Sequence, residues 1–397
     1  MKPTPTYSPR VSILTDPVST EVIRPPVVGW TTFGHPAATR LLSKSSESGR
    51  LSHAYLITGP DKIGKRTLAL DIACMVNSEP VVDMFGEATS IDLNASHQAQ
   101  RIRKGLHSDV RVIDIYTESK RDLVASANKR KVAHTKIRIN PILDLIESTS
   151  VSPLEGAMKV FVIDGAQYMS EEAAGALLKT LEEPQETAMI VILADSMESL
   201  PETVVSRCQR IELRTVDPEV IESELIERFE AEESQARSLS RLARGCPGWA
   251  IDALNDSTIV DGHNQSVLRF AEIVTGNIEE RFRYARQTGG LFWRDRDAVL
   301  AEMQRWLEWW RDIAMMRHKL DDHVTNTEWA ELLSEIANQM KESQISAAVT
   351  SIQDATLALE ANAVPQLTFE VLMLDLPWAD PAKVPSLTFG DSDDTEY

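Results

Sequence analysis

Short apolar runs alternate with longer amphipathic segments through the first half of the chain. The runs are rich in branched side chains and have the length of buried strands, and they cover residues 53–58, 110–115, 159–164, 189–194 and 210–213. Helical patterns separate them, and the pair Asn140 and Pro141 predicts one helix start. Strands that alternate with helices predict an α/β domain with a parallel sheet covered on both faces.

The last third of the chain has helical periodicity throughout. Val299, Met303, Trp306, Trp310 and Ile313 recur at steps of four and three, which predicts an apolar stripe along one helix. The simplest interpretation is the core of a helical bundle. Contact of part of the stripe with neighbouring subunits is the alternative.

These patterns divide the chain into an α/β core, a small helical lid and an all-α C-terminal domain, flanked by two polar ends. We expect both ends to be disordered, because the first holds six prolines without an apolar signal core and the second is acidic and polar. The predicted boundaries are 1–29 for the Pro-rich extension, 30–215 for the core, 216–262 for the lid, 263–379 for the C-terminal domain and 380–397 for the acidic tail.

Charge, cysteine content and hydropathy argue against several classes of protein. The net charge of −19 argues against a chain that binds nucleic acid by itself, and we expect the basic stretch at 120–138 to be a solvated loop. Cys74, Cys208 and Cys246 are scattered, which predicts neither disulfides nor a metal site and suits a reducing cytoplasm. Because no apolar run could span a bilayer, we expect no membrane partner.

A phosphate-binding loop (P-loop) pattern follows the first strand. Gly59, Gly64 and Lys65 fit it, because glycines let backbone N–H groups approach phosphate and the lysine supplies a charge. Arg66 replaces the Ser or Thr whose hydroxyl binds magnesium, and Lys62 replaces an inner glycine. A vestigial loop that only joins strand to helix is the favoured interpretation. Binding of ATP with magnesium is the alternative.

The acid at the end of the third run is typical of a Walker B strand. Asp164 is placed to hold magnesium on a nucleotide phosphate. Gly165 follows where an ATPase carries a glutamate that polarises the attacking water, and glycine has no side chain for this task. We therefore predict that this chain cannot hydrolyse ATP alone.

A third motif comprises Ser206, Arg207 and Cys208, just before the last strand of the core. An arginine in this position can stabilise a phosphoryl group held by a neighbouring subunit, and such an arginine finger contributes about 10³–10⁵ in rate. A surface arginine paired with a carboxylate is the alternative, which spacing alone favours. We expect Cys208 to be a small buried apolar side chain.

The segment between these motifs carries a family resemblance. Residues 170–184 closely resemble a segment of bacterial AAA+ clamp-loader subunits, and with their flanking motifs they resemble the delta-prime branch of the DNA polymerase III clamp-loader family. Residues 32–60 and 362–374 resemble the same family, so the resemblance covers about residues 30 to 376. Glu182 and Glu183 stand at the unfavourable C-terminal end of a predicted helix, either for an interface or as a tolerated cost.

Two family features are missing. The lid arginine of AAA+ ATPases is replaced by Gly248 and Trp249, neither of which can bind phosphate. Clamp-loader subunits often hold a four-cysteine zinc module after the P-loop helix, but only Cys74 stands there, so we expect no zinc. The polar segment 77–108 takes the place of the module.

The resemblance implies a non-catalytic subunit that requires no cofactor. Its C-terminal domain would be the collar that binds motor subunits and a clamp-opening subunit in a hetero-oligomeric ring. The ring would load a sliding clamp on primed DNA, with Arg207 acting in trans. Two alternatives remain: an ATP-hydrolysing motor subunit, which Lys65 and Asp164 favour, and a pure scaffold, which Arg207 disfavours.

Overall fold

The computed structural model describes residues 24–117 and 136–384. They form two compact units, one up to Arg214 and one from Thr215, so the core ends one residue before the predicted boundary. The predicted lid and C-terminal domain fall within the second unit. Most of the predicted basic stretch lies outside the described residues, as do 1–23 and 385–397.

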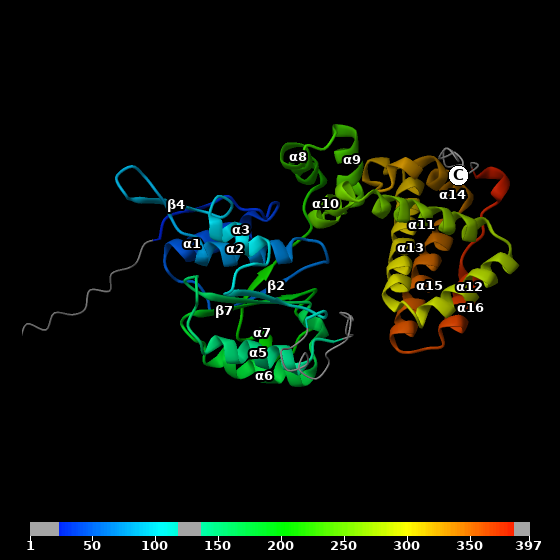
Figure 1. The fold of residues 1–397 in the computed structure, drawn as a ribbon. Helices are drawn as coiled ribbons and strands as arrows, with labels where there is room; N and C mark the ends of the chain where they lie inside the picture. The colour runs from blue at the N-terminus through cyan, green and yellow to red at the C-terminus, as the bar shows by residue number, and fades with distance from the viewer. Residues whose placement is uncertain (1–23, 118–135, 385–397) are drawn as a thin grey trace, which may run out of the picture. The chain divides into compact units, whose positions relative to one another are not determined.

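The first unit contains a parallel five-stranded sheet, which confirms the predicted α/β fold (Figure 1). In spatial order its strands are β5 (Val110–Ile113), β6 (Lys159–Asp164), β7 (Ala188–Ala194), β2 (Ala54–Thr58) and β8 (Gln209–Glu212). All adjacent pairs are parallel. The central strands are almost wholly buried, which explains why they appear in the sequence as continuous apolar runs.

Helices cover both faces of this sheet (Figure 1). One face carries α1 (Pro36–Glu47), α2 (Lys65–Asn77) and α3 (His97–Arg103), and the other carries α5 (Ile139–Thr149), α6 (Glu171–Glu182) and α7 (Glu202–Val205). A short 3₁₀ turn, η1 (Ala166–Tyr168), follows β6. Helix α5 begins two residues earlier than predicted, with Arg138 rather than Asn140 as its N-cap residue.

The prediction of a disordered extension through residue 29 is wrong for its last residues. β1 (Val27–Val28) pairs in parallel with β4 (Ala88–Asp92), which pairs antiparallel with β3 (Val81–Val82). Pro26 does not prevent this pairing, because its carbonyl oxygen accepts a hydrogen bond from the Ile91 N–H at 2.8 Å. These strands form a small second sheet of order β1–β4–β3.

The described part of the second unit is helical. Its α-helices are α8 (Pro218–Phe229), α9 (Glu233–Leu242), α10 (Pro247–Asn255), α11 (Ser257–Thr275), α12 (Ile278–Phe292), α13 (Arg296–Arg317), α14 (Ala330–Gln339), α15 (Glu342–Glu360) and α16 (Pro365–Asp375). The predicted boundary between 262 and 263 falls inside α11. Short 3₁₀ turns are η2 (Asp321–His323), η3 (Thr327–Trp329) and η4 (Pro381–Lys383), so the first residues of the predicted acidic tail are ordered. None of the helices of the described chain is long and apolar enough to cross a membrane.

The predicted apolar stripe forms the core of this bundle. Its five members on α13 are all buried, which confirms the simpler of the two interpretations. Phe270 of α11 packs edge-on against Trp306 and Trp310, with ring centroids 6.1 and 5.5 Å apart. Trp309, which the stripe did not include, is buried as well. The aromatic side chains therefore hold α11 and α13 together.

Arg281 is a buried cation in α12. Its guanidinium donates hydrogen bonds of 2.7–3.1 Å to five backbone carbonyl oxygens, those of Ile273, Val274, Met373, Leu376 and Pro377. These carbonyls lie at or just beyond the C-terminal ends of α11 and α16, where intrahelical partners are missing. One side chain therefore satisfies the ends of two helices, and burial lowers its pKa.

Candidate functional site

The P-loop joins β2 to α2, so it lies at the carboxyl edge of the parallel sheet. Gly59 and Gly64 have φ angles of 149° and 109°, which side-chain-bearing residues rarely adopt. A Cβ atom on Gly59 would lie 2.4 Å from the carbonyl oxygen of Leu213. The loop therefore has the glycine-dependent turn that the sequence predicted.

Lys65 is neutralised by its own surroundings. Its Nζ donates hydrogen bonds to the carbonyl oxygens of Gly59 at 2.6 Å and Pro60 at 3.1 Å. It also forms a 2.8 Å ion pair with Asp195, whose other carboxylate oxygen accepts a 2.7 Å hydrogen bond from the Gln167 amide. The amine that would contact phosphate in a P-loop ATPase is therefore bound to this chain.

Asp195 is a site residue that sequence reasoning missed. It directly follows β7, which lies between β6 and β2 in the sheet. The sequence contained a signal for it. An acid at the end of the apolar run 189–194 must lie at the same sheet edge as Asp164, because both runs are parallel strands. The omission matters, because Asp195 is the anionic partner of Lys65.

Arg66 forms an ion pair with Asp164, with 3.3 Å between Nη1 and Oδ2. Burial raises the pKa of the Asp164 carboxyl, and the nearby Arg66 charge opposes that rise. The sequence-predicted residues Gly59, Gly64, Lys65, Arg66 and Asp164 thus lie together around one sheet edge. A guanidinium rather than a hydroxyl faces the Walker B acid.

Two further departures from the ATPase pattern, at positions 62 and 165, have unusual backbone conformations. Lys62, at the inner glycine position, has a φ of 57°, so a lysine occupies a left-handed conformation that favours glycine. Gly165 has a φ of 79°, and a Cβ there would lie 3.1 Å from the Tyr168 ring. A glutamate at 165 would therefore strain the turn after β6. Trp249, at the lid position, packs edge-on against His263 at 6.4 Å.

Arg207 follows α7, and its contacts lie on α6 and on its own turn. The guanidinium forms an ion pair with Glu182 and donates to the Thr203 carbonyl at 2.8 Å and to the Ser206 hydroxyl at 3.2 Å. The Arg207 side chain is 33% exposed and that of Glu182 is 50% exposed. The arginine–carboxylate pair that spacing alone favoured is therefore present, on the surface. The ion pair with Arg207 offsets the unfavourable position of the Glu182 carboxylate at the C-terminal end of α6.

Cys208 is half-buried against the core of the first unit. Burial raises the pKa of its thiol to about 11, with a smaller opposing effect of Arg210. The thiol is therefore protonated at neutral pH, and this agrees with a packing role rather than a nucleophilic one.

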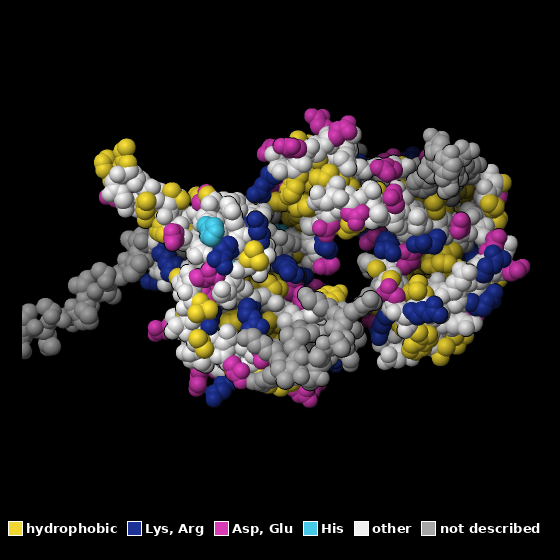
Figure 2. Space-filling view, in the orientation of Figure 1, with side chains coloured by type: hydrophobic (Ala, Val, Ile, Leu, Met, Phe, Trp, Pro, Cys, Tyr) yellow, Lys and Arg dark blue, Asp and Glu magenta, His cyan; other side chains and the backbone are white. Residues whose placement is uncertain are grey.

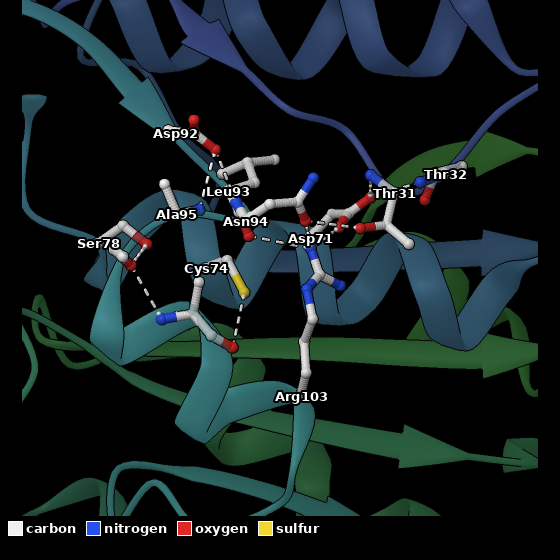
Figure 3. A network of polar contacts seen from close by, with 12 residues as sticks. Thr31, Thr32, Asp71, Cys74, Ser78, Asp92, Leu93, Asn94, Ala95 and Arg103 are labelled. Atoms are coloured by element: carbon white, nitrogen blue, oxygen red, sulfur yellow. Dashed lines mark hydrogen bonds and ion pairs between the residues drawn. The ribbon is translucent and has the colours of Figure 1, made fainter. Parts of the chain in front are cut away.

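A polar network organises the segment that follows α2 (Figure 3). The buried carboxylate of Asp71 accepts hydrogen bonds from the backbone N–H groups of Thr31 and Thr32 and forms a 2.7 Å ion pair with Arg103. Arg103 also donates to the Leu93 carbonyl at 3.1 Å and to the Asn94 amide oxygen at 3.2 Å. The network joins α2, α3 and the chain before α1 without a metal ligand.

Cys74 lies beside this network, with its sulfur 3.9 Å from the Ala99 carbonyl oxygen (Figure 3). Burial raises the pKa of its thiol to about 11. Within residues 24–117 and 136–384, no group of three His, Cys, Asp or Glu side chains is arranged to hold a metal ion.

The sheet order, the P-loop after β2 and the acid that ends β6 define an α/β core of the P-loop class. Residues 34–217 match the family model described as "DNA polymerase III, delta subunit". Over this segment, which is less than half of the chain, it is similar to the bacterial DNA polymerase III clamp-loader family.

Its relatives include several kinds of subunit. The chain is 28% identical over 243 residues to DNA polymerase III subunit tau of Escherichia coli, covering 60% of this chain and 34% of that protein. It is 24% identical over 341 residues to subunit delta' of Bacillus subtilis, covering 86% and 95%. It is 29% identical over 225 residues to subunit gamma of Buchnera aphidicola, covering 56% of each. The chain thus spans about one third of the tau relative but nearly all of the delta' relative.

Proposed function

We propose that this chain is a non-catalytic, delta-prime-type subunit of a DNA polymerase III clamp loader. In this proposal it acts in the cytoplasm as part of a hetero-oligomeric ring of motor and clamp-opening subunits. The ring uses ATP to load a sliding clamp on primed DNA. This chain hydrolyses no ATP and supplies Arg207 to the ATP of a neighbouring subunit. The extent of the match to the delta' relative supports this assignment.

The internal neutralisation of the P-loop is the observation that carries the proposal. Lys65 is bonded to two P-loop carbonyls and to Asp195, and Arg66 is paired with Asp164. Binding of magnesium on a nucleotide would require Asp164 to exchange Arg66 for the metal, and position 66 offers no hydroxyl ligand. The donor set therefore fits magnesium poorly, and no step of hydrolysis is assigned to this chain.

Arg207 is suited to act outside its own subunit. Its pair with Glu182 lies at the surface and is partly exposed, and surface pairs contribute about 0–1 kcal/mol. The guanidinium can therefore exchange the carboxylate for a phosphate oxygen at small cost. Its planar fork then matches the charge that develops on the phosphoryl group during transfer.

Helix α16 supports the proposed assembly through the collar. One side of the helix packs into the bundle core through Phe369, Leu372 and Met373. The other side is apolar too but exposed, with a row at steps of three and four that comprises Val364, Leu367, Val371 and Leu374. An exposed apolar row opposite the buried one is typical of a helix that packs against a second surface. We therefore assign this row, the α16 stripe, to contact with a sister collar.

The double substitution Leu367→Ser/Leu374→Ser is expected to weaken binding of this chain to the motor subunits about 10-fold, because it removes two apolar anchors from the stripe. Sedimentation or calorimetric titration of the purified proteins measures the change. Leu320→Ser is the matched control, since Leu320 is an exposed leucine of the same unit outside the stripe. Equal affinity of the double variant and the wild type would remove the α16 stripe from the proposed interface.

An ATP-hydrolysing motor subunit is the second candidate function. The retained Lys65 and Asp164 favour it, as do the tau and gamma relatives. Lys65→Ala separates the two candidates in a reconstituted complex. We expect unchanged ATP turnover, because the amine already binds its own loop, whereas a motor subunit would lose the turnover of that site. Thermal unfolding of the variant verifies that the P-loop change leaves the fold intact.

A further inference from the structure

The hairpin of β3 and β4 ends in two apolar side chains that pack against little. Met84 is 88% exposed and Phe85 is 84% exposed, at the tip of the turn between the strands. Figure 2 shows hydrophobic side chains at the end of this hairpin, which projects from the first unit near the label β4 in Figure 1. Burying a side chain of this size contributes about 1.5–3 kcal/mol, so leaving both in water is unfavourable.

The turn that presents them is held in one conformation. The carboxylate of Asp83 accepts hydrogen bonds from the N–H groups of Phe85 at 2.8 Å and Glu87 at 2.9 Å. Two further backbone hydrogen bonds, from Asp83 N–H to the Glu87 carbonyl and from Gly86 N–H to the Asp83 carbonyl, close the loop. Gly86 has a φ of 84°, which suits glycine at this place. A turn fixed before binding lowers the entropic cost of docking.

The charge around the tip limits what it can bind. Residues 79–92 contain four carboxylates, those of Glu79, Asp83, Glu87 and Asp92, and no Lys or Arg. Nucleic acid and anionic lipid would both be repelled by this charge. A protein pocket that is apolar at its floor and carries Lys or Arg at its rim complements both the exposed side chains and the carboxylates.

We propose that Met84 and Phe85 form a docking tip that inserts into a basic-rimmed apolar pocket of a protein partner within the clamp-loading assembly. The proposal rests on the proposed function for the identity of the assembly. The tip supplies the apolar anchors, Asp83 fixes their presentation, and Glu79 and Glu87 add electrostatic attraction at the edge. The hairpin belongs to the segment that replaces the family's zinc module, so the tip adds a contact site in a place the resemblance did not predict.

The test titrates the purified full-length chain against the purified motor subunit, clamp-opening subunit and sliding clamp in turn, and against zwitterionic vesicles. In Met84→Ser/Phe85→Ser we expect the affinity for one of these proteins to fall about 10-fold or more. Glu79→Lys/Glu87→Lys is expected to weaken the same complex, and added salt should weaken the wild-type complex. Leu154→Ser, which alters an equally exposed leucine of the same unit, is the control and should bind as the wild type does.

Three outcomes overturn the proposal: equal affinity of the tip variant for every protein, a loss seen only with vesicles, or a loss seen only in self-association of this chain. Both tip side chains are exposed and the turn's hydrogen bonds use backbone N–H groups, so the variant retains its fold, which circular dichroism checks. Failure of the wild type to bind any of the three proteins would instead reject the proposed function itself. The two failures are therefore distinct.

Discussion

Replacing Arg207 with alanine is expected to lower ATP turnover about 10³-fold at the neighbouring site that this arginine completes. Assembly should be unchanged, because the lost pair with Glu182 is a surface pair worth little to stability. The measurement is DNA-stimulated phosphate release from a reconstituted complex in which the other ATP sites have been inactivated. Size-exclusion chromatography of the same sample verifies that the ring has formed.

Two further variants sharpen this result. Arg207→Lys keeps the charge but loses the planar fork, so we expect it to recover little of the turnover. Arg214→Ala removes an arginine that is 81% exposed and pairs with Glu212, and it should leave turnover at the wild-type level. Unchanged turnover in Arg207→Ala would reject the arginine-finger role and favour a pure scaffold.

Replacing Arg281 with methionine is expected to lower the free energy of unfolding by about 3–5 kcal/mol, because a buried acceptor without a partner costs about 1–3 kcal/mol. Methionine retains much of the side-chain volume but donates no hydrogen bond to the five carbonyls at the ends of α11 and α16. Urea unfolding of the full chain measures the change, with tryptophan fluorescence as the signal.

The control for this prediction is Arg283→Ala on the same helix. Arg283 is 57% exposed, and its 3.9 Å ion pair with Glu279 is a surface pair, so the change should stay within about 0.5 kcal/mol. A loss below 1 kcal/mol in Arg281→Met would show that water or local rearrangement satisfies the carbonyls. The buried guanidinium would then not be what holds α11 and α16 together.

The sheet and the P-loop edge were predictable because their signals are local. Strands buried on both faces appear as continuous apolar runs, and their carboxyl ends must meet at one edge, which places Lys65 and Asp164 together. The stripe on α13 is a local signal as well, and its interpretation as bundle core was correct. The domain boundary near 214 followed from the end of the last apolar run.

The remaining features depend on contacts between distant residues. β1 was expected to be disordered, because prolines precede it in the sequence. The strand forms only by pairing with β4, which the sequence does not indicate. Asp71 and Arg103 are 32 residues apart, and neither is distinctive in sequence. Glu182 was seen only as an unfavourable helix end, since its partner Arg207 lies 25 residues away. The roles of Ser206, Arg207 and Cys208 in trans stay predictions.

The most direct test of the account is steady-state ATP turnover by the purified chain alone, in saturating ATP with magnesium. The P-loop amine and the Walker B carboxylate already bind groups of this chain, so we predict no turnover above that of a Lys65→Ala/Asp164→Ala control. Magnesium-dependent hydrolysis at about 1 s⁻¹ or faster, abolished in that control, would contradict the account and identify the chain as a motor subunit.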